Sequence, residues 1–519
     1  MTAALALAAR GLTVEIIERR SGPSDSPKAI SLDDESLRLY QAVGIVDDVL
    51  AIVVPGTGTS YYDSDGALLF DGRSPQPLRL GYPFKNPFAQ PDLEGVLYRA
   101  LQRDPHIEAR FSSELLEIAD DGAAVRAEIS SPEGQRTAHA SYVIAADGGR
   151  STVRQQLGIT MTGRNFDDVW LVADTLHDAS RERYGMHHGD PGRPHVVVPG
   201  LHGRCRYEFL LTAQEAGRLD GEPPFELIQQ LVSRYRAITP DEVERAVTYR
   251  FHALNADSWR SGRIFLAGDA AHMMPPFAGQ GLNSGLRDVA NLAWKLEKVI
   301  GGRLNTDVLD SYELERRPHV AAVIASSVML GRIVMTPHDR VARRRDATIQ
   351  RALETDDGRD FFQQMRYRPI ARFTEGMVVT GQDAPLVGTQ IGQPRVFDFI
   401  RHQIVLFDEL LGTNWSLLAV GVDPAVAAEA LAAVPELHPR VVAVPLDDRL
   451  DDYPAGVEVA VDLDRRLYAE LEPLRGRLVL IRPDRFVAAV WHPGDAIDPA
   501  IRRWSAVIAT HPHNAPHTA

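Results

Sequence analysis

The chain has 519 residues, of which 44% are apolar and 24% charged, and its formal net charge at pH 7 is -14. This length allows two to four domains with a large core, and the acidic balance argues against nucleic acid, which needs a basic surface. The single cysteine, Cys205, excludes an internal disulfide and a CxxC redox pair. We expect no membrane span, since no stretch reaches roughly 20 apolar residues, and no signal peptide, since no basic region leads the chain. A cytoplasmic protein is therefore predicted.

The first elements resemble the second half of a βαβ unit. Residues 2–11 form an alanine-rich predicted helix that ends at a glycine, and residues 12–18 form a strand that ends at Glu18. In a dinucleotide-binding fold, a strand and a GxGxxG turn precede such a helix, and the acid binds ribose hydroxyls. We expect that this turn is missing, through truncation or loss, and that dinucleotide binding is weakened. The alternative for Glu18 is an ordinary surface acid.

Helices and one strand-turn-helix follow. A helix is predicted to start after residue 26 and to end near Gly44, and another to start at Gln90. Residues 141–154 form a strand, a turn and a helix, with Asp147 at the strand end. An aspartate before two glycines is also an ordinary turn signal.

Residues 163–252 change to a strand-rich pattern, with a helix over 224–235. We expect a sheet that covers a substrate. The segment is rich in histidine and arginine, but no ligand spacing with acids or cysteine supports a metal site.

The most informative stretch is residues 262–302. An apolar run over 264–267 predicts a buried parallel strand that ends at Gly268 and Asp269. After a loop with two prolines, apolar residues three and four apart predict a helix over 282–300. The carboxylate then lies where α/β sheets bind ligands, and the glycines at 279 and 281 expose backbone N–H groups at a helix N-terminus that favours an anion. A reduced flavin would suit this site; an ordinary strand-loop-helix is the alternative.

The rest of the chain is predicted to be helical and then α/β. Helices are expected over 309–319 and 320–330, and a solvated helix or linker over 339–359. From residue 388, short strands alternate with helices such as 425–434, which predicts a small α/β domain. Residues 511–519 are expected to be a frayed tail.

The stretch from Gly262 to Leu296 resembles the second FAD-binding motif of the flavoprotein aromatic hydroxylases, which have the p-hydroxybenzoate hydroxylase fold. The likeness extends to residues 26–41, 309–319 and 478–489, and within the family it is strongest to the 3-(3-hydroxyphenyl)propionate hydroxylases. The family usually has arginine where this chain has Lys28, and lysine lacks the guanidinium fork. The resemblance implies these cofactor-binding residues, with no catalytic residue or metal ligand identified: Glu18, Lys28, Arg38, Gln90, Asp147, Gly268, Asp269, Pro275, Gly279, Gly281, Leu282 and Asn283.

Some of these residues have ordinary alternatives. Arg38 is a candidate partner of the FAD pyrophosphate, but it is equally a solvated helix charge. A glutamine such as Gln90 before a helix is more often only a cap. Asp147 matches the family aspartate that serves FAD and the nicotinamide pyrophosphate.

The resemblance implies an α/β fold with an FAD-binding Rossmann-like domain in two parts, residues 1–162 and 253–387. It further implies a substrate-binding sheet domain over 163–252 and a thioredoxin-like domain over 388–519. The implied enzyme uses FAD, NADH or NADPH, and O₂ to hydroxylate a small phenol ortho to its hydroxyl through a flavin C4a-hydroperoxide. The chemistry belongs to the cofactor. The C-terminal domain, which lacks cysteine, is expected to serve structure or a homodimer contact.

Three alternatives remain open. The chain could be a sibling hydroxylase of a polyketide or antibiotic, a flavin enzyme of another class such as a halogenase or dehydrogenase, or a flavin-free truncated scaffold. No lysine-based tunnel motif of a halogenase is evident.

A phenylpropionate substrate would bring a carboxylate that must be neutralised when it leaves water. Cations of the covering sheet are the candidates for this role. We expect at least one of Arg183, Arg204, Arg206, His195 and His202 to contact the carboxylate.

Overall fold

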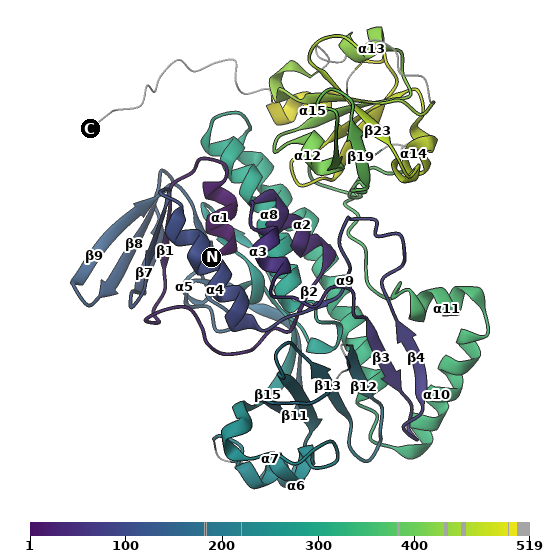
Figure 1. Ribbon diagram of the computed structural model, residues 1–519. Helices are drawn as coiled ribbons and strands as arrows, with labels where there is room; N and C mark the ends of the chain where they lie inside the picture. Colours follow the sequence, from purple (N-terminus) through teal and green to yellow (C-terminus); the bar gives the residue numbers. More distant parts are fainter. Residues whose placement is uncertain are drawn as a thin grey trace.

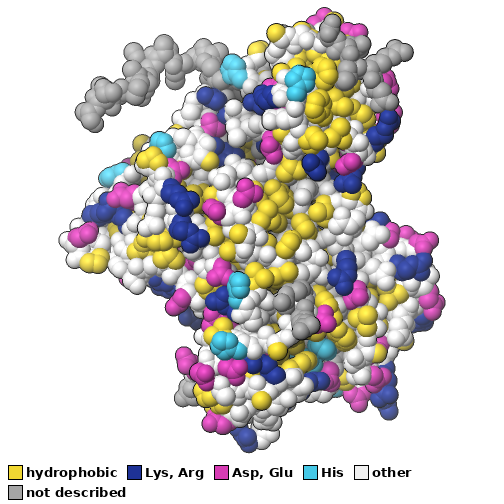
Figure 2. Space-filling model, in the orientation of Figure 1, with side chains coloured by type: hydrophobic (Ala, Val, Ile, Leu, Met, Phe, Trp, Pro, Cys, Tyr) yellow, Lys and Arg dark blue, Asp and Glu magenta, His cyan; other side chains and the backbone are white. Residues whose placement is uncertain are grey.

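The computed structural model describes residues 1–180, 182, 184–219, 221–380, 385–429, 434–447, 453–496 and 498–505. The chain forms a mixed α/β molecule with the C-terminal α/β domain as a separate lobe above the rest (Figure 1). On the face shown in Figure 2, basic and acidic side chains are interspersed, and neither sign forms a continuous stripe. The α/β class predicted from the sequence is confirmed.

The dinucleotide-binding region contains two short parallel ladders. Strand β1 (Val14–Ile17) pairs with β6 (Ile107–Arg110), and β10 (Val143–Ala145) pairs with β17 (Ile264–Leu266). Strand β16 (Arg260–Ser261) extends the second ladder in the antiparallel sense. The predicted strands before Glu18 and Gly268 are thus present, and each ends beside a candidate cofactor-binding acid.

Helix α8 (Gly281–Ile300) is central to this region and matches the predicted helix. It packs against α1 (Thr2–Ala8), and both of its faces are buried. The apolar face joins the main core through residues such as Leu286, Leu292 and Leu296. The polar face is buried as well, because partners from α2, β18, α9 and the C-terminal domain satisfy it. Its buried residues include Arg287, Asp288, Asn291, Lys295 and Lys298.

Other helices and small sheets surround α8. They are α2 (Asp34–Ala42), α3 (Val46–Leu50), α4 (Gln90–Arg103), α5 (Thr152–Gln156), the pair β2 (Ser31–Leu32) and β5 (Asn86–Pro87), and the antiparallel sheet β7 (Glu114–Asp120), β8 (Val125–Ser131) and β9 (Gly134–Ala140).

An eight-stranded sheet forms the lower part of the molecule in Figure 1. Its centre is the long antiparallel pair β11 (Met161–Thr175) and β15 (Val243–Ala256). The sheet extends beyond the predicted segment 163–252, because β3 (Thr59–Tyr62) pairs in parallel with β12 (Gly185–His188). The remaining strands are β4 (Leu68–Gly72), β13 (His195–Pro199), β14 (Cys205–Leu210) and β18 (His272–Met273); helices α6 (Ala213–Ala216) and α7 (Phe225–Val232) follow β14 in the chain.

The two helices expected over 309–330 are one helix, α9 (Ser311–Val334), with Pro318 inside it. The charged segment after it forms α10 (Asp339–Leu353), followed by α11 (Asp356–Gln363). Among the described residues, no single helix is long and apolar enough to cross a membrane, although the bent pair Thr306–Val334 and Asp339–Leu353 passes that test by length and composition.

The C-terminal domain is built on a seven-stranded sheet in the order β20-β19-β23-β22-β21-β24-β25. Strands β21 and β22 are parallel, while β24 and β25 run antiparallel to their neighbours. The elements are β19 (Arg395–Asp398), β20 (Gln403–Leu406), α12 (Phe407–Leu411), β21 (Ser416–Val420), α13 (Pro424–Glu429), β22 (Arg440–Val444), β23 (Val457–Asp462), α14 (Arg466–Leu471), β24 (Arg477–Ile481), β25 (Val487–Trp491) and α15 (Pro499–Ser505). Residues 430–433 of the predicted helix and the tail 511–519 lie outside the described residues.

A buried ionic cluster joins this domain to the helices below it. Arg482 donates to both carboxylate oxygens of Glu315 on α9, at 2.7 and 2.8 Å, and Lys295 of α8 donates to the same carboxylate at 2.7 Å. All three side chains are fully buried. Removing one member would leave a charge uncompensated, so this cluster fixes the C-terminal domain against α8.

Candidate functional site

Strand β17 and helix α8 meet at a tight turn that contains Gly268 and Asp269. Gly268 has a φ of 59°, a conformation that favours glycine. A Cβ added to Gly285 of α8 would lie 3.1 Å from the Cα of Gly268. Glycine at both positions therefore lets the helix pack directly on the end of the strand.

Asp269 is the acid that this turn presents. Burial raises the pKa of Asp269, while His272 and Lys28 nearby act in the opposite direction. The carboxylate makes no hydrogen bond or ion pair with another residue of the described chain. An unpaired carboxylate of this kind can accept a hydrogen bond from a hydroxyl of a bound molecule.

The N-terminus of α8 lies beside this acid and is open. Gln280 is the N-cap residue, and no side chain caps the helix. Gly279 adopts the left-handed conformation, and a Cβ added to Gly281 would meet nothing within 4 Å. Free backbone N–H groups facing open space at the end of a 20-residue helix fit an anionic or polar ligand edge.

Asn283, predicted to bind the cofactor, holds the loop in place through its side chain. Its amide donates to the carbonyls of Gly279, at 2.7 Å, and Ser31, at 3.0 Å, and its oxygen accepts from the backbone of Asp33 at 3.0 Å. The side chain is thus committed within the protein. Pro275 lies at the start of the short turn Pro276–Ala278, and Leu282 in the first turn of α8.

Sequence reasoning missed the support beneath the turn. Asp288 of α8 is fully buried and accepts from the backbone of Gly268 at 3.1 Å, from His272 Nε2 at 2.7 Å and from Arg316 at 3.0 Å. Burial acts to raise the pKa of Asp288, but His272 and Arg316 outweigh it and lower the pKa overall. The only sequence signal was an acid on the polar face of the helix, which usually marks a solvated position.

Lys28 and Gln90 lie on neighbouring segments. Gln90 accepts from the backbone of Ala29 at 2.8 Å, and Arg206 donates to the carbonyl of Lys28 at 2.5 Å. Arg206 also forms an ion pair of 2.6 Å with Asp174 and is buried. Gln90 and Arg206 therefore fix the position of Lys28 from two sides.

Glu18 and Asp147 both lie at strand ends, as predicted. Glu18 follows β1 and accepts from the backbone of Arg20 at 2.9 Å. Asp147 follows β10, is exposed, and accepts from the backbone of Val153 at 3.0 Å at the start of α5. Each of these carboxylates can accept further hydrogen bonds from a ligand.

Arg38 requires a correction. Its guanidinium is buried and donates to both carboxylate oxygens of Asp408, at 2.6 Å each, and to the carbonyl of Ile391 at 2.9 Å. It connects α2 to the C-terminal domain and is not available to a pyrophosphate. A buried arginine needs a carboxylate, and a sequence cannot show that this one comes from 370 residues away.

Three of the cations expected to bind a substrate carboxylate are also committed elsewhere. Besides Arg206, Arg204 pairs with Glu244 at 3.1 Å, and His195 contacts the hydroxyl of Tyr235. His202 lies in a turn with a φ of 56°, and Arg183 lies outside the described residues. Arg204, Arg206 and His195 are therefore occupied within the protein, whereas His202 is exposed.

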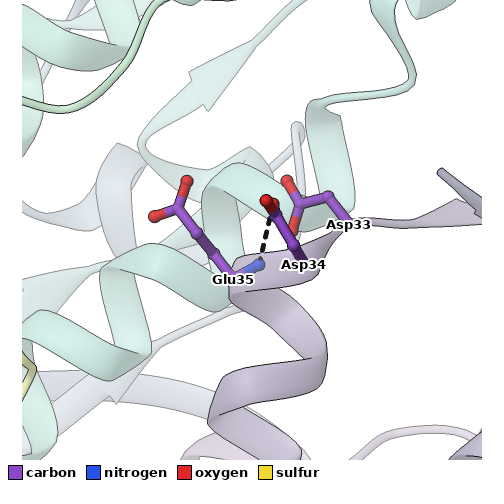
Figure 3. Close-up of side chains that lie close together, drawn as sticks. All are labelled: Asp33, Asp34 and Glu35. Atoms are coloured by element: carbon purple, nitrogen blue, oxygen red, sulfur yellow. Dashed lines mark hydrogen bonds between the residues drawn. The ribbon is translucent and has the colours of Figure 1, made fainter. Parts of the chain in front are cut away.

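Three consecutive acids, Asp33, Asp34 and Glu35, point toward one region at the start of α2 (Figure 3). Two arginines neutralise them. Arg287 pairs with Asp33 and, at 2.9 Å, with Glu35, and Arg368 pairs with Asp34 at 2.9 Å and Glu35 at 2.7 Å. The guanidinium groups occupy the position that a metal ion would need, so the cluster is a structural ion network.

A pocket lies next to the loop that leads into α8. The space between its walls, with the open solvent at its mouth included, is about 390 Å³. Its walls come from five segments far apart in the sequence: β3, residues 84–85, the loop at 277–280, residues 323–330 of α9, and residues 365–369. The lining residues are Thr59, Tyr61, Phe84, Lys85, Phe277, Ala278, Gln280, Val323, Ser326, Leu330, Met365, Tyr367, Arg368 and Pro369.

The comparisons with known proteins agree with this geometry. The FAD binding domain family matches residues 1–327, and the HcaD C-terminal domain family matches residues 388–503. Among solved structures, aklavinone-11 hydroxylase in complex with FAD and aklavinone has a TM-score of 0.77 at 23% identity, covering 97% of this chain and 96% of that one. A p-nitrophenol 4-monooxygenase from Pseudomonas putida has a TM-score of 0.62 at 27% identity, covering 70% of this chain and 94% of that one.

Curated relatives are closer in sequence. The chain is 35% identical to a 3-(3-hydroxyphenyl)propionate/3-hydroxycinnamic acid hydroxylase of Mycolicibacterium smegmatis, over 94% of this chain and 88% of the relative. It is 33% identical to a protein of the same name from Klebsiella pneumoniae, over 93% and 88%. With the open helix terminus, the free strand-end acid and the adjoining pocket, these matches show that the chain belongs to the FAD-dependent aromatic hydroxylases and is a flavoprotein monooxygenase acting on an aromatic substrate.

Proposed function

We propose that this chain hydroxylates a phenolic acid of the 3-(3-hydroxyphenyl)propionate class, ortho to its hydroxyl, with FAD, NADH or NADPH, and O₂. The observation that carries the proposal is the pocket wall formed by Phe277, Ala278 and Gln280. These residues belong to the same loop that leads into the open N-terminus of α8, so a substrate in the pocket would adjoin a cofactor at the helix. The names of the curated relatives support the choice of substrate.

Several residues are proposed to bind FAD. Asp269 would accept from a ribityl hydroxyl, and Glu18 from the ribose. The backbone N–H groups at Gly279 and Gly281 would face the N1/O2 edge of the ring, where reduced flavin carries its negative charge. Lys28, held by Gln90, would lie beside the flavin, and Asp147 would serve the pyrophosphate region. Asn283 would act by positioning the loop.

The bound FAD would accept a hydride from the nicotinamide and activate O₂ for transfer to the ring. The protein's contribution is then to orient the phenol, to stabilise charge at the flavin edge and to exclude water. The pocket residues suit the last task, because Phe277, Leu330 and Val323 form an apolar part of the wall.

The four-part division at residues 162, 252 and 387 is likewise proposed, with the strands β3 and β4 added to the substrate-binding sheet. The C-terminal domain is proposed to be a structural or dimer-forming unit, since ion pairs, hydrogen bonds and packing connect it to the flavin region.

The experiment that tests the function measures NADH and NADPH oxidation by the FAD-loaded protein with a panel of ligands. The panel contains 3-(3-hydroxyphenyl)propionate, 3-hydroxycinnamate, phenol and a polycyclic phenol, with mass spectrometry of the products. We expect the two acids to stimulate oxidation and to gain one oxygen atom. Hydroxylation of the polycyclic phenol alone would favour a polyketide substrate, and no hydroxylated product from any ligand would refute the proposal.

A further inference from the structure

Lysine is rare in this chain, which contains only Lys28, Lys85, Lys295 and Lys298. The two lysines of α8 have partners: Lys295 binds Glu315 at 2.7 Å, and Lys298 binds Asn414 at 2.7 Å. Lys85 has no hydrogen-bond or ion-pair partner for its ammonium group among the described residues, although it is partly buried. An unpaired, partly desolvated cation is unfavourable unless something else compensates it.

Lys85 lines the pocket, and its ammonium group lies beside strand β12 of the sheet. A Cβ added to Gly185 of β12 would lie 3.5 Å from Lys85 Nζ, 3.7 Å from Thr59 Oγ1 and 3.9 Å from His187 Nε2. The ammonium, hydroxyl and imidazole groups therefore surround one point. Thr59 donates its hydroxyl to the carbonyl of Gly185 at 3.1 Å, which leaves the ammonium of Lys85 as the charged donor available to an anion.

The neighbouring groups leave the charge of Lys85 uncancelled. His187 is buried and stacks on Tyr61 at 4.6 Å, and burial, with a smaller contribution from Lys85, lowers the pKa of His187 well below its ordinary value. Burial also raises the pKa of Tyr61 and of Tyr367, so both phenols are neutral. No carboxylate of the described chain lies within ion-pair distance of Lys85.

Arg368 is the other cation of the pocket wall, and it differs in being neutralised. It pairs with Asp34 and Glu35, at 2.9 and 2.7 Å, and its guanidinium lies 4.1 Å from the centre of the Phe84 ring. The positive charge of Arg368 is thus neutralised by carboxylates of the protein. Of the two cations on the pocket wall, only Lys85 is uncommitted.

Burial lowers the pKa of Lys85 to about 8, so the group is still mostly protonated at neutral pH. A substrate carboxylate beside the ammonium group of Lys85 would replace the interactions with water that burial removed. The loop at Phe277 and Gln280 forms a different wall of the same pocket. A molecule with a carboxylate at Lys85 could therefore present its ring toward the flavin loop.

We propose that Lys85 binds the carboxylate of the substrate and thereby selects phenolic acids over neutral phenols. The inference rests on the proposed function, and it names the residue that sets the substrate class. Thr59 and His187 assist as neutral groups beside the ammonium.

The test uses the full chain loaded with oxidised FAD and no nicotinamide, so that ligands bind without turnover. Calorimetry gives the Kd of 3-(3-hydroxyphenyl)propionate and of the matching neutral alcohol, 3-(3-hydroxyphenyl)propanol. In Lys85→Met, we expect the acid to bind roughly tenfold to a hundredfold more weakly, the value of a charged hydrogen bond, and the alcohol to bind as before. Lys85→Arg should recover part of the affinity, because it keeps the charge but changes the geometry.

Arg73→Met is the matched control. Arg73 is an exposed cation just after β4 on the same sheet and donates to the carbonyl of Thr57 at 2.8 Å, but it does not line the pocket. Loss of Arg73 should leave the Kd of the acid nearly unchanged. This control distinguishes a direct contact with the substrate from the effect of removing one positive charge from the protein. The thermal midpoint of Lys85→Met should equal or exceed that of the wild type, because an uncompensated cation is removed.

Equal losses for acid and alcohol, or an unchanged Kd for the acid, would overturn the role of Lys85 while leaving the proposed function intact, provided that the wild type hydroxylates the acid. If the wild type neither binds nor hydroxylates the acid, the proposed function fails and the inference fails with it.

Discussion

The two sides of the site are built in different ways. On the flavin side, one continuous stretch, residues 264–300, supplies the strand, the turn with Asp269 and the helix N-terminus. On the substrate side, the pocket wall is assembled from five separate segments and carries one cation without a partner among the described residues, Lys85. A local motif can bind the cofactor that all members share, whereas a wall made of separate segments can change its ligand one residue at a time. The following predictions test this difference.

The largest effect is expected at Asp288, which accepts a hydrogen bond from the backbone of Gly268 in the turn that contains Asp269. Asp288→Ala would leave Arg316 and His272 without their buried partner and should lower the free energy of unfolding by about 3–5 kcal/mol. Denaturant titration of the apo-protein measures it. Because the folded-state pKa of Asp288 lies below the ordinary 3.8, its stabilisation is complete above that value and is lost as the pH falls through the folded-state pKa. A variant as stable as the wild type would show that the turn does not depend on this network.

The next effect concerns the free acid itself. Asp269→Ala should purify mostly without FAD, because the carboxylate that would bind the cofactor hydroxyl is gone, while the apo-protein should stay folded. The ratio of flavin to protein absorbance measures occupancy. Asp65→Ala, at an exposed turn, is the control and should keep its FAD. Full occupancy in Asp269→Ala would contradict the assignment.

Two glycines of α8 have different surroundings: Gly281 faces open space, and Gly285 packs against Gly268. A Cβ at position 281 meets nothing in the protein, so Gly281→Ala should keep the apo-protein's stability but weaken FAD binding. A Cβ at position 285 would lie 3.1 Å from the Cα of Gly268, so Gly285→Ala should destabilise the apo-protein. Thermal midpoints and FAD titrations of both variants measure this. The account of the open terminus fails if Gly281→Ala binds FAD as tightly as the wild type.

The smallest effect is a change with pH on the substrate side. Since the pKa of Lys85 is about 8, its positive charge is present below that pH and lost above it. The kcat/KM for the acid, which reports the free enzyme, should therefore fall between pH 7 and about 9 relative to that for the neutral alcohol. Both ligands share the phenol, so its ionisation cancels in the ratio. In Lys85→Met the ratio should be flat with pH; a wild-type ratio that does not change would contradict the prediction.

The same difference explains what could be predicted from the sequence. The strand, turn and helix at 264–300 follow from apolar periodicity and glycine placement within one stretch, and they are found where expected. Arg38 and Arg206 are candidates for ligand binding in the sequence, because their carboxylate partners, Asp408 and Asp174, are brought near only by the fold. Lys85 could not be recognised, because what marks it is the absence of a nearby carboxylate in the described structure, which no local pattern encodes.

The buried polar face of α8 illustrates the same limit. Lys295 and Asp288 have the spacing of a solvated helix face, yet both are fully buried, with partners on α9 and, for Asp288, also on β18. A helical pattern gives which residues share a face, but only the tertiary structure decides what covers that face.

The central claim is that the chain transfers one atom of O₂ to a phenolic acid. The most direct measurement is a reaction of the FAD-loaded protein with NADH or NADPH and 3-(3-hydroxyphenyl)propionate under ¹⁸O₂, followed by mass spectrometry. The account predicts a dihydroxylated acid that carries one ¹⁸O atom. Nicotinamide oxidation that yields only hydrogen peroxide, or a product without the label, would contradict it.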